Sequence, residues 1–184
     1  MLGEDEVQYT ISPSEDSTIA IEISKTGLLR KYKHLLFFQN FGGEFRYSSA
    51  QPEVSRLNMT IDANSIVCRD RWLKARKQRR ITEYARSLAN AAGKHPEIRF
   101  SSNRMASKPL RGFVVEGVLD VWGTTRVLKV NLVLSPRTDG RLQLDADSSI
   151  RLTDFGVSPP TSYFGLAGTK DEAVIHVLLW ARAS

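Results

Sequence analysis

The sequence predicts an all-β protein of about eight antiparallel strands, in a sandwich or a closed barrel, with one inserted helix near residues 72–92. Three observations support this prediction. Apolar and polar residues alternate with a period of two through most of the chain, which is the pattern of half-buried strands. Short turn signals separate the alternating runs and favour hairpins over crossover helices. Only one stretch spaces its apolar residues as a helix does.

The strands are predicted from alternation. One alternating segment places Ile19, Ile21 and Ile23 on the same face. A later alternating segment does so with Leu57, Met59 and Ile61. The later runs 113–122, 126–134 and 173–182 carry apolar residues on both faces, as strands do that line a cavity or are covered on both sides. Two more runs are predicted over 97–101 and 141–152. Turns are predicted at Gly42-Gly43, Gly123–Thr125, Pro136–Gly140 and Pro159-Pro160.

The helix is predicted from the spacing of Ile81, Tyr84, Ala85 and Leu88, and Gly93 is well placed to end it. The 184 residues, 41% hydrophobic and 25% charged, suit one globular domain over 1–184 with its core in 9–182. The acidic start of the chain differs from a secretory signal, so we expect a cytoplasmic protein, or a periplasmic one if a signal precedes residue 1.

The net charge of +6 arises from one segment, residues 69–80, which holds seven cations and the single anion Asp70. We consider four of its residues candidates for binding an anionic group, and they lie close to the start of the predicted helix: Arg76, Lys77, Arg79 and Arg80. Weak contact with an anionic membrane surface would suit them. The alternative is a hydrated approach to the helix without a partner. Nucleic acid is not expected, because only Trp72 interleaves these charges with an aromatic ring.

Several motifs occur in an order that resembles the YceI-like family, lipocalin-like barrels associated with polyisoprenoid binding. The motifs are Tyr9-Thr10-Ile11-Ser12-Pro13, Phe38-Gln39-Asn40-Phe41-Gly42-Gly43, Ile61-Asp62-Ala63-Asn64-Ser65-Ile66, His95-Pro96-Glu97-Ile98-Arg99-Phe100, Val115–Gly123 and Asp154-Phe155-Gly156. The resemblance extends over residues 9–182. It implies a barrel that holds a long apolar ligand, an isoprenoid or another lipid-like molecule.

The interior of an eight-stranded barrel is either filled by side chains or just large enough for one small ligand, and the pattern does not separate these outcomes. The aromatic cluster of residues 37–47 likewise fits core packing or a pocket wall. The candidate pocket residues are His34, Phe37, Phe38, Phe41, Phe45, Leu57, Met59, Ile61, Phe100, Leu119, Val121 and Phe155. Two other functions stay open: a lipid-linked enzyme or enzyme accessory, and a filled barrel that contacts an anionic partner through residues 69–80.

Catalytic and metal chemistry are not expected. Asp154-Phe155-Gly156 also occurs in protein kinases, but no other kinase motif accompanies it. The three histidines and the lone Cys68 have no metal-ligand spacing, so we expect no metal and no cofactor. Cys68 is expected to be buried at a strand end. The sequence leaves a homodimer open.

Overall fold

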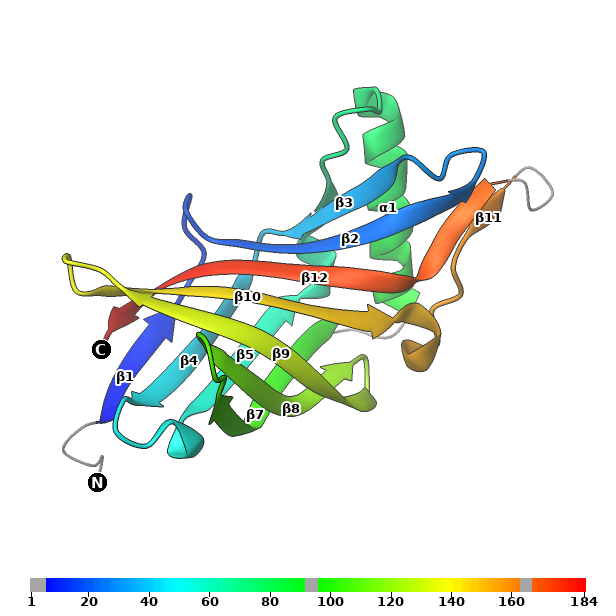
Figure 1. Cartoon of the computed structure of the whole chain (residues 1–184). Helices are drawn as coiled ribbons and strands as arrows, with labels where there is room; N and C mark the ends of the chain where they lie inside the picture. The colour runs from blue at the N-terminus through cyan, green and yellow to red at the C-terminus, as the bar shows by residue number, and fades with distance from the viewer. Residues whose placement is uncertain (1–5, 92–95, 163–166) are drawn as a thin grey trace.

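The computed structural model describes residues 6–91, 96–162 and 167–184, in which antiparallel strands surround an interior and one helix packs against them (Figure 1). The strands are β1 (Glu6–Ile11), β2 (Thr18–Gly27), β3 (Lys33–Phe38), β4 (Phe41–Ser48), β5 (Arg56–Asp62), β6 (Ile66–Cys68), β7 (Glu97–Ser107), β8 (Phe113–Val121), β9 (Thr124–Pro136), β10 (Arg141–Arg151), β11 (Thr161–Ser162) and β12 (Ala167–Ala183). The helix is α1 (Ala75–Ala91), and short 3-10 helices are η1 (Pro52–Val54), η2 (Ala63–Ser65) and η3 (Leu152–Phe155).

The sheet closes on itself through its first and last strands. Hydrogen-bonded neighbours follow the order β1-β4-β5-β7-β8-β9-β10-β12, and β12 pairs back with β1, with Tyr9 opposite Ala183 and Ile11 opposite Ala181. Figure 1 shows β1 beside the C-terminal end of β12. The predicted fold, an eight-stranded antiparallel barrel with one helix, is confirmed.

Three neighbouring positions of the barrel are each occupied by a strand in two pieces. β1 and β2 lie in line, because both pair with β12, through Ile11–Ala181 and then Thr18–Leu178. β4 continues the line of β3, and β6 continues the line of β5 beyond η2. The breaks divide the barrel into two levels. The lower level is the closed ring, and the upper level carries β2, β3 and β6, with α1 packed against β6 and η2 (Figure 1).

The helix begins at Ala75, three residues later than the predicted bound of 72, and its predicted last residue lies outside the described residues. Trp72 is held outside the helix because its indole Nε1 donates to the carbonyl of Lys33 over 2.8 Å and its ring stacks on Tyr32 at 4.5 Å between centroids. These contacts fix Trp72 to β3. Within the described ranges, no helix combines the length and the hydropathy needed to cross a bilayer.

The predicted turn at Gly42-Gly43 is wrong, because both residues lie inside β4. Gly43 is opposite Met59 in the register of β4 and β5, and a Cβ on Gly43 would clash with the carbonyl of Asn58 and the side chain of Met59. The glycine therefore permits close approach of two strands. The turn near Gly123 consists of Trp122 and Gly123, both with positive φ (55° and 86°), and Thr124 and Thr125 already belong to β9.

Candidate functional site

The barrel encloses an interior cavity of about 130 Å³. Its walls come from most strands of the barrel, since inward-facing residues alternate with outward-facing ones along each strand. The lining is apolar except for Asp147 and Ser148. The apolar residues are Ile19, Ile21, Phe38, Leu57, Met59, Ile61, Ile98, Phe100, Val115, Leu119, Val121, Leu128, Val130, Leu132, Leu144, Ala146, Ile150, Ile175, Val177 and Leu179.

Seven of the candidate pocket residues meet around this cavity: Phe38, Leu57, Met59, Ile61, Phe100, Leu119 and Val121. None of the candidate pocket residues lies on β9, β10 or β12. The signal was present, because Leu128, Val130 and Leu132 alternate on one face of β9, as do Leu144 and Ala146 on β10. In β9 and β12, apolar residues on both faces leave the inward face undetermined, whereas β10 alternates cleanly and its apolar face could have been predicted to point inward.

Phe41 and Phe45 are buried in the core without lining the cavity. Phe45 has no exposed surface and stacks between Tyr9 and Tyr47, with ring centroids 6.3 and 5.5 Å away. These rings fill the end of the barrel where β1 and β4 pair, so the cavity lies further along the barrel.

His34 and Phe37 lie on β3, outside the cavity lining. The His34 ring places Nδ1 2.6 Å from Oδ2 of Asp70, and the other carboxylate oxygen accepts the backbone N–H of Leu35, also over 2.6 Å. Phe37 lies on the opposite face, under the guanidinium of Arg69 at 5.1 Å. Asp70 was not among the candidate residues, although its being the only acid in residues 69–80 was a signal.

The carboxyl of Asp70 is fully buried, and burial by itself would raise its pKa. Hydrogen bonds from His34, the amide of Leu35 and Cys68 outweigh that effect and hold the pKa below its ordinary value. The neighbouring Cys68 is buried as expected, and burial raises the pKa of its thiol to about 11. Cys68 is therefore a protonated, unreactive thiol at neutral pH. The pair of His34 and Asp70 ties β3 to the segment that leads into α1.

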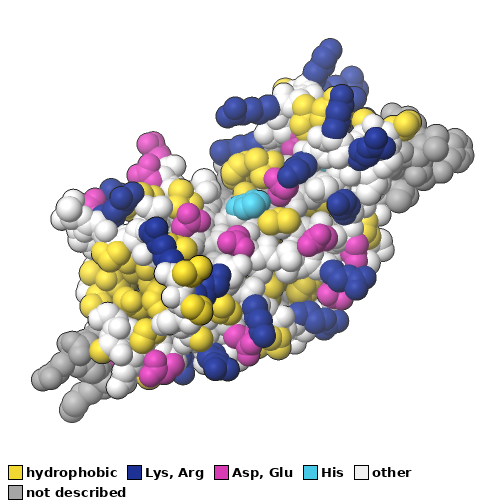
Figure 2. Space-filling view, in the orientation of Figure 1, with side chains coloured by type: hydrophobic (Ala, Val, Ile, Leu, Met, Phe, Trp, Pro, Cys, Tyr) yellow, Lys and Arg dark blue, Asp and Glu magenta, His cyan; other side chains and the backbone are white. Residues whose placement is uncertain are grey.

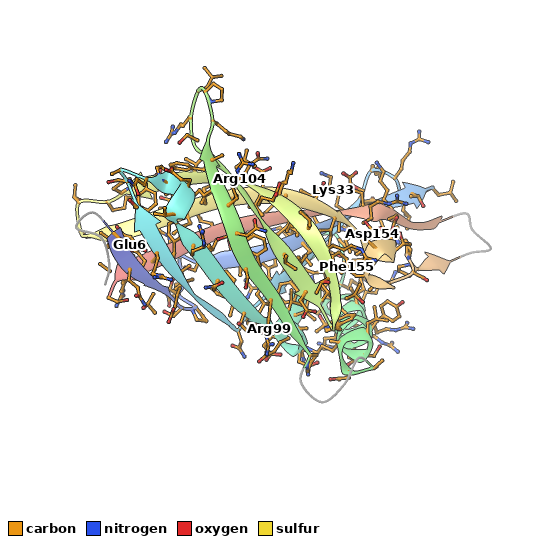
Figure 3. All side chains as sticks on the ribbon, turned by 90° about the horizontal axis from the view of Figure 1, so that it is seen from below. Glu6, Lys33, Arg99, Arg104, Asp154 and Phe155 are labelled. Carbon is orange, nitrogen blue, oxygen red and sulfur yellow. The ribbon has the colours of Figure 1, made fainter. Side chains whose placement is uncertain are left out.

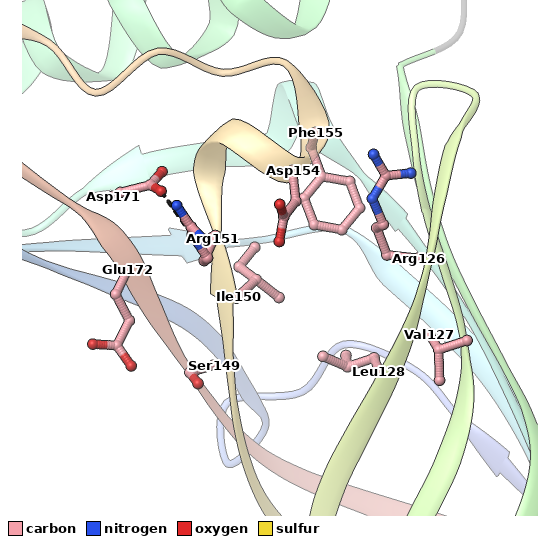
Figure 4. A pocket seen from close by; sticks show the side chains of 10 residues that line it. All are labelled: Arg126, Val127, Leu128, Ser149, Ile150, Arg151, Asp154, Phe155, Asp171 and Glu172. Atoms are coloured by element: carbon pink, nitrogen blue, oxygen red, sulfur yellow. Dashed lines mark hydrogen bonds and ion pairs between the residues drawn. The ribbon is translucent and has the colours of Figure 1, made fainter.

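A second, larger hollow of about 460 Å³ lies on the outside of the barrel wall, between β9, β10 and η3 (Figure 4). We call it the lateral cleft, and it is lined by Arg126, Val127, Leu128, Ser149, Ile150, Arg151, Asp154, Phe155, Asp171 and Glu172. Phe155 therefore belongs to this cleft rather than to the interior cavity. Figure 3 shows Asp154 and Phe155 near one end of the barrel and Glu6 near the other.

Hydrogen bonds fix one side of the lateral cleft. Asp171 accepts from the hydroxyl (2.7 Å) and the amide (2.9 Å) of Thr153 and pairs with Arg151 at 3.0 Å. These partners lower the pKa of Asp171, so it is ionised at neutral pH. Arg126 and Asp154 lie on opposite sides of the Phe155 ring (Figure 4). Within the described ranges, neither Arg126 nor Asp154 forms an ion pair.

The four candidate anion-binding residues, Arg76, Lys77, Arg79 and Arg80, are all exposed on the first turns of α1. In Figure 2, Lys and Arg side chains gather over this part of the molecule. Across residues 6–91, 96–162 and 167–184, no ion pair involves any of the four. The same part of the chain contains no group of three or more His, Cys, Asp or Glu residues placed to hold a metal ion.

Solved structures share this fold. BcnA of Burkholderia cenocepacia superimposes with a TM-score of 0.64 at 17% identity, covering 88% of this chain and 95% of that one. A polyisoprenoid binding domain from Saccharophagus degradans, implicated in plant cell wall breakdown, gives 0.61 at 14% identity, covering 95% and 98%. The YceI protein of Campylobacter jejuni gives 0.59 at 18% identity, covering 81% and 84%.

Sequence comparison agrees with the structures. A UPF0312 protein of Pectobacterium carotovorum is 26% identical over 149 residues, 76% of this chain and 70% of the relative. A UPF0312 protein of Yersinia enterocolitica is 25% identical over the same length and shares of the two chains. The model of the YceI-like domain matches residues 9–179, nearly the span over which the motifs occur in order. The chain therefore belongs to the YceI-like domain family.

Proposed function

We propose that this protein binds an apolar molecule, or the apolar part of an amphiphile, inside its barrel. The observation that carries the proposal is the interior cavity, whose lining is apolar except for Asp147 and Ser148. Apolar cavities of this kind stay dry and take up apolar guests. An apolar guest that enters loses its contact with water and gains contacts with the surrounding side chains.

An isoprenoid is the ligand class that we propose. The support comes from the Saccharophagus degradans domain, which is described as polyisoprenoid-binding and shares the fold of this chain. The cavity volume of about 130 Å³ limits the size of the group that fits inside, because a cavity of ~150 Å³ admits a benzene-sized molecule. One five-carbon unit therefore fits the interior as it stands. A longer chain requires interior side chains to change rotamer, or it extends out of the barrel.

We propose binding without catalysis. The polar groups at the cavity wall already have partners: the Ser148 hydroxyl donates to the carbonyl of Lys129 over 2.7 Å, and the Asp147 carboxylate accepts from the Asn131 amide over 2.9 Å. General acid–base chemistry needs a titratable side chain free to exchange a proton with the substrate, and nucleophilic chemistry needs a nucleophile within hydrogen-bond reach of a base. The remaining lining is hydrocarbon or aromatic.

Filling the cavity tests the proposal. We expect a hydrophobic fluorescent probe to bind the protein at one saturable site and an isoprenoid to displace it. Ala146→Leu adds three carbons at a buried position of the lining and should weaken probe binding at least about tenfold, the factor that corresponds to ~1.4 kcal/mol. The matched control is Val118→Leu on the outer face of β8, which should bind as the unaltered protein does. Equal affinities of the Ala146→Leu and Val118→Leu proteins would contradict an interior site.

A second proposed role, contact with an anionic membrane surface, rests on the exposed cations of α1. Cations near the start of a helix oppose its dipole, so helix stability does not explain them. We expect weak binding to vesicles that contain anionic lipid at low salt and its loss at 0.5 M-scale salt, where the Debye length is below ~5 Å. Sedimentation with vesicles, for the unaltered protein and for one with Arg76, Lys77, Arg79 and Arg80 changed to Glu, provides the measurement. Equal binding by both proteins would exclude α1 as the contact.

A further inference from the structure

The barrel wall has a gap between β9 and β10. The two strands pair from Leu142–Pro136 to Asp147–Asn131, and the pairing ends there. Beyond that point β9 pairs only with β8, as far as Thr124, and β10 pairs only with β12, as far as Arg151. The Ser148 hydroxyl, which donates to the carbonyl of Lys129, marks the point where the strands separate.

At this gap the interior cavity and the outer hollows share lining residues. Leu128 on β9 and Ile150 on β10 line both the interior cavity and the lateral cleft. Leu128, Asp147 and Ser148 also line both the cavity and a further hollow of about 440 Å³ on the outer side of the same gap. Val127, on the outer face at this gap, is 68% exposed, which is unusual for a β-branched apolar side chain beside a polar cleft.

We propose that the gap between β9 and β10 is a lateral portal, through which the apolar end of the ligand enters the barrel while its polar end stays in the lateral cleft. This inference rests on the proposed function. It also explains how a small interior can serve a long ligand, since a ligand longer than one isoprene unit extends through the portal into the cleft. Phe155, which is buried in η3, lines the cleft between Asp154 and Arg126 (Figure 4).

The charges of the cleft define the class of polar end that it accepts. Its lining holds the cations Arg126 and Arg151 and the anions Asp154, Asp171 and Glu172, so negative charge is in excess by one. Arg151 is already paired with Asp171. Among the described residues, the cleft then has one unpaired cation, Arg126, and two further carboxylates, Asp154 and Glu172, which repel a phosphate and accept hydrogen bonds from a hydroxyl. The ligand of this portal is an amphiphile whose polar end carries no negative charge, with a prenyl alcohol as the simplest example.

Narrowing the portal tests the route. Val127→Trp and, separately, Ser149→Trp place a bulky ring on the exposed outer rim of the gap from either strand. Because a ligand must enter and leave by the same path, a blocked path slows both steps and leaves the dissociation constant nearly unchanged. We expect the association and dissociation rate constants of a prenyl alcohol, measured by stopped flow, each to fall about tenfold.

The matched control is Val118→Trp, since Val118 lies opposite Val127 in the β8–β9 register but on the side of β9 away from the gap. Its rates should equal those of the unaltered protein. Unchanged rates in both rim variants would overturn the portal, as would weaker binding with an unchanged association rate. No binding of any probe or alcohol by the unaltered protein is a different outcome, because it contradicts the proposed function itself.

Comparing two ligands tests the assignment of the polar end. We expect a prenyl alcohol to bind at least about tenfold more tightly than the monophosphate of the same alcohol. Asp154→Asn combined with Glu172→Gln should reduce this difference, and Asp145→Asn, an exposed acid of β10 outside the cleft lining, should leave it unchanged. Binding of the phosphate as tightly as the alcohol would overturn the assignment and leave the portal to be judged from the rates.

Discussion

Asp70 concentrates several stabilising contacts on one carboxylate. Its side chain is buried and accepts the Leu35 amide at one oxygen and contacts Nδ1 of His34 at the other. Its own carbonyl accepts from the side-chain amide of Gln78 in α1 over 2.8 Å. Asp70 therefore connects β3, the segment after β6 and the first turn of α1.

Replacing Asp70 should destabilise the protein. Asp70→Ala leaves the Leu35 amide and the His34 ring without an acceptor, at a cost of about 2–4 kcal/mol, and Asp70→Asn should cost less because it keeps an acceptor. Chemical denaturation measures both. Asp145→Asn, at an exposed position, should change the free energy of unfolding by no more than about 0.5 kcal/mol. Equal stability of the Asp70→Ala and Asp145→Asn proteins would show that the buried contacts contribute nothing.

The contribution of Asp70 should depend on pH. Its pKa in the folded protein lies below the ordinary value of 3.8, so the stabilisation is complete above that value and is lost as the pH falls through the lower folded pKa. Melting curves of the unaltered and Asp70→Asn proteins should therefore converge as the pH is lowered below about 4. A difference in stability that stays constant down to pH 2 would contradict the lowered pKa.

Among the secondary-structure elements, α1 separates a packed face from a charged one. Ala89 is buried and Ile81 and Ala85 pack against the core, whereas Arg76, Lys77, Arg79 and Arg80 are exposed. Reversing these four charges should leave thermal stability nearly unchanged, within about 0.5 kcal/mol for each residue. Differential scanning calorimetry is the measurement. A large loss of stability would mean that these side chains are paired in the folded protein.

The elements that could be predicted are those whose signal is local. Leu57, Met59 and Ile61 lie in one strand, Arg56–Asp62, as their alternation predicts, because the pattern is complete within seven residues. The pair Gly42-Gly43 predicts a turn, since glycine usually marks one, and only the close approach of β5 explains a glycine at position 43 of this strand. Trp72 was placed in the helix, but it is bound to β3, a partner 39 residues away along the chain.

At the scale of the whole molecule, the barrel depends on a short seam between the two ends of the chain. Tyr9, Thr10 and Ile11 pair with β12 on one side, and β4 pairs along the other edge of β1. A chain that lacks residues 1–11 exposes the edges of β4 and β12, and exposed edges pair with other chains. We expect that protein to self-associate in size-exclusion chromatography. The control lacks only residues 1–5, keeps all of β1, and should elute as the full chain does.

The all-β architecture could be predicted because most of the strands contribute an alternating pattern, and a sandwich or a closed barrel is one of few ways to bury it. The candidate site could be predicted only in part. Met59 and Phe100 lie on inward faces that the alternation of their own strands indicates. The gap between β9 and β10 has no local signal, because it depends on where the pairing of two strands ends. The contact of His34 with Asp70 likewise joins positions that only the fold brings together.

The division of the barrel into two levels also bears on how the native protein opens. In the lower level each strand has a neighbour on both sides, whereas in the upper level β6 ends the hydrogen-bonded order after β3. Backbone amides of β3 and β6 can therefore exchange with solvent deuterium through local opening. Exchange of the amides of β8 and β12 requires global unfolding. Amide exchange should show two classes of protection that divide at the strand breaks. Such a protein loosens around α1 while the eight hydrogen-bonded strands of the ring stay paired.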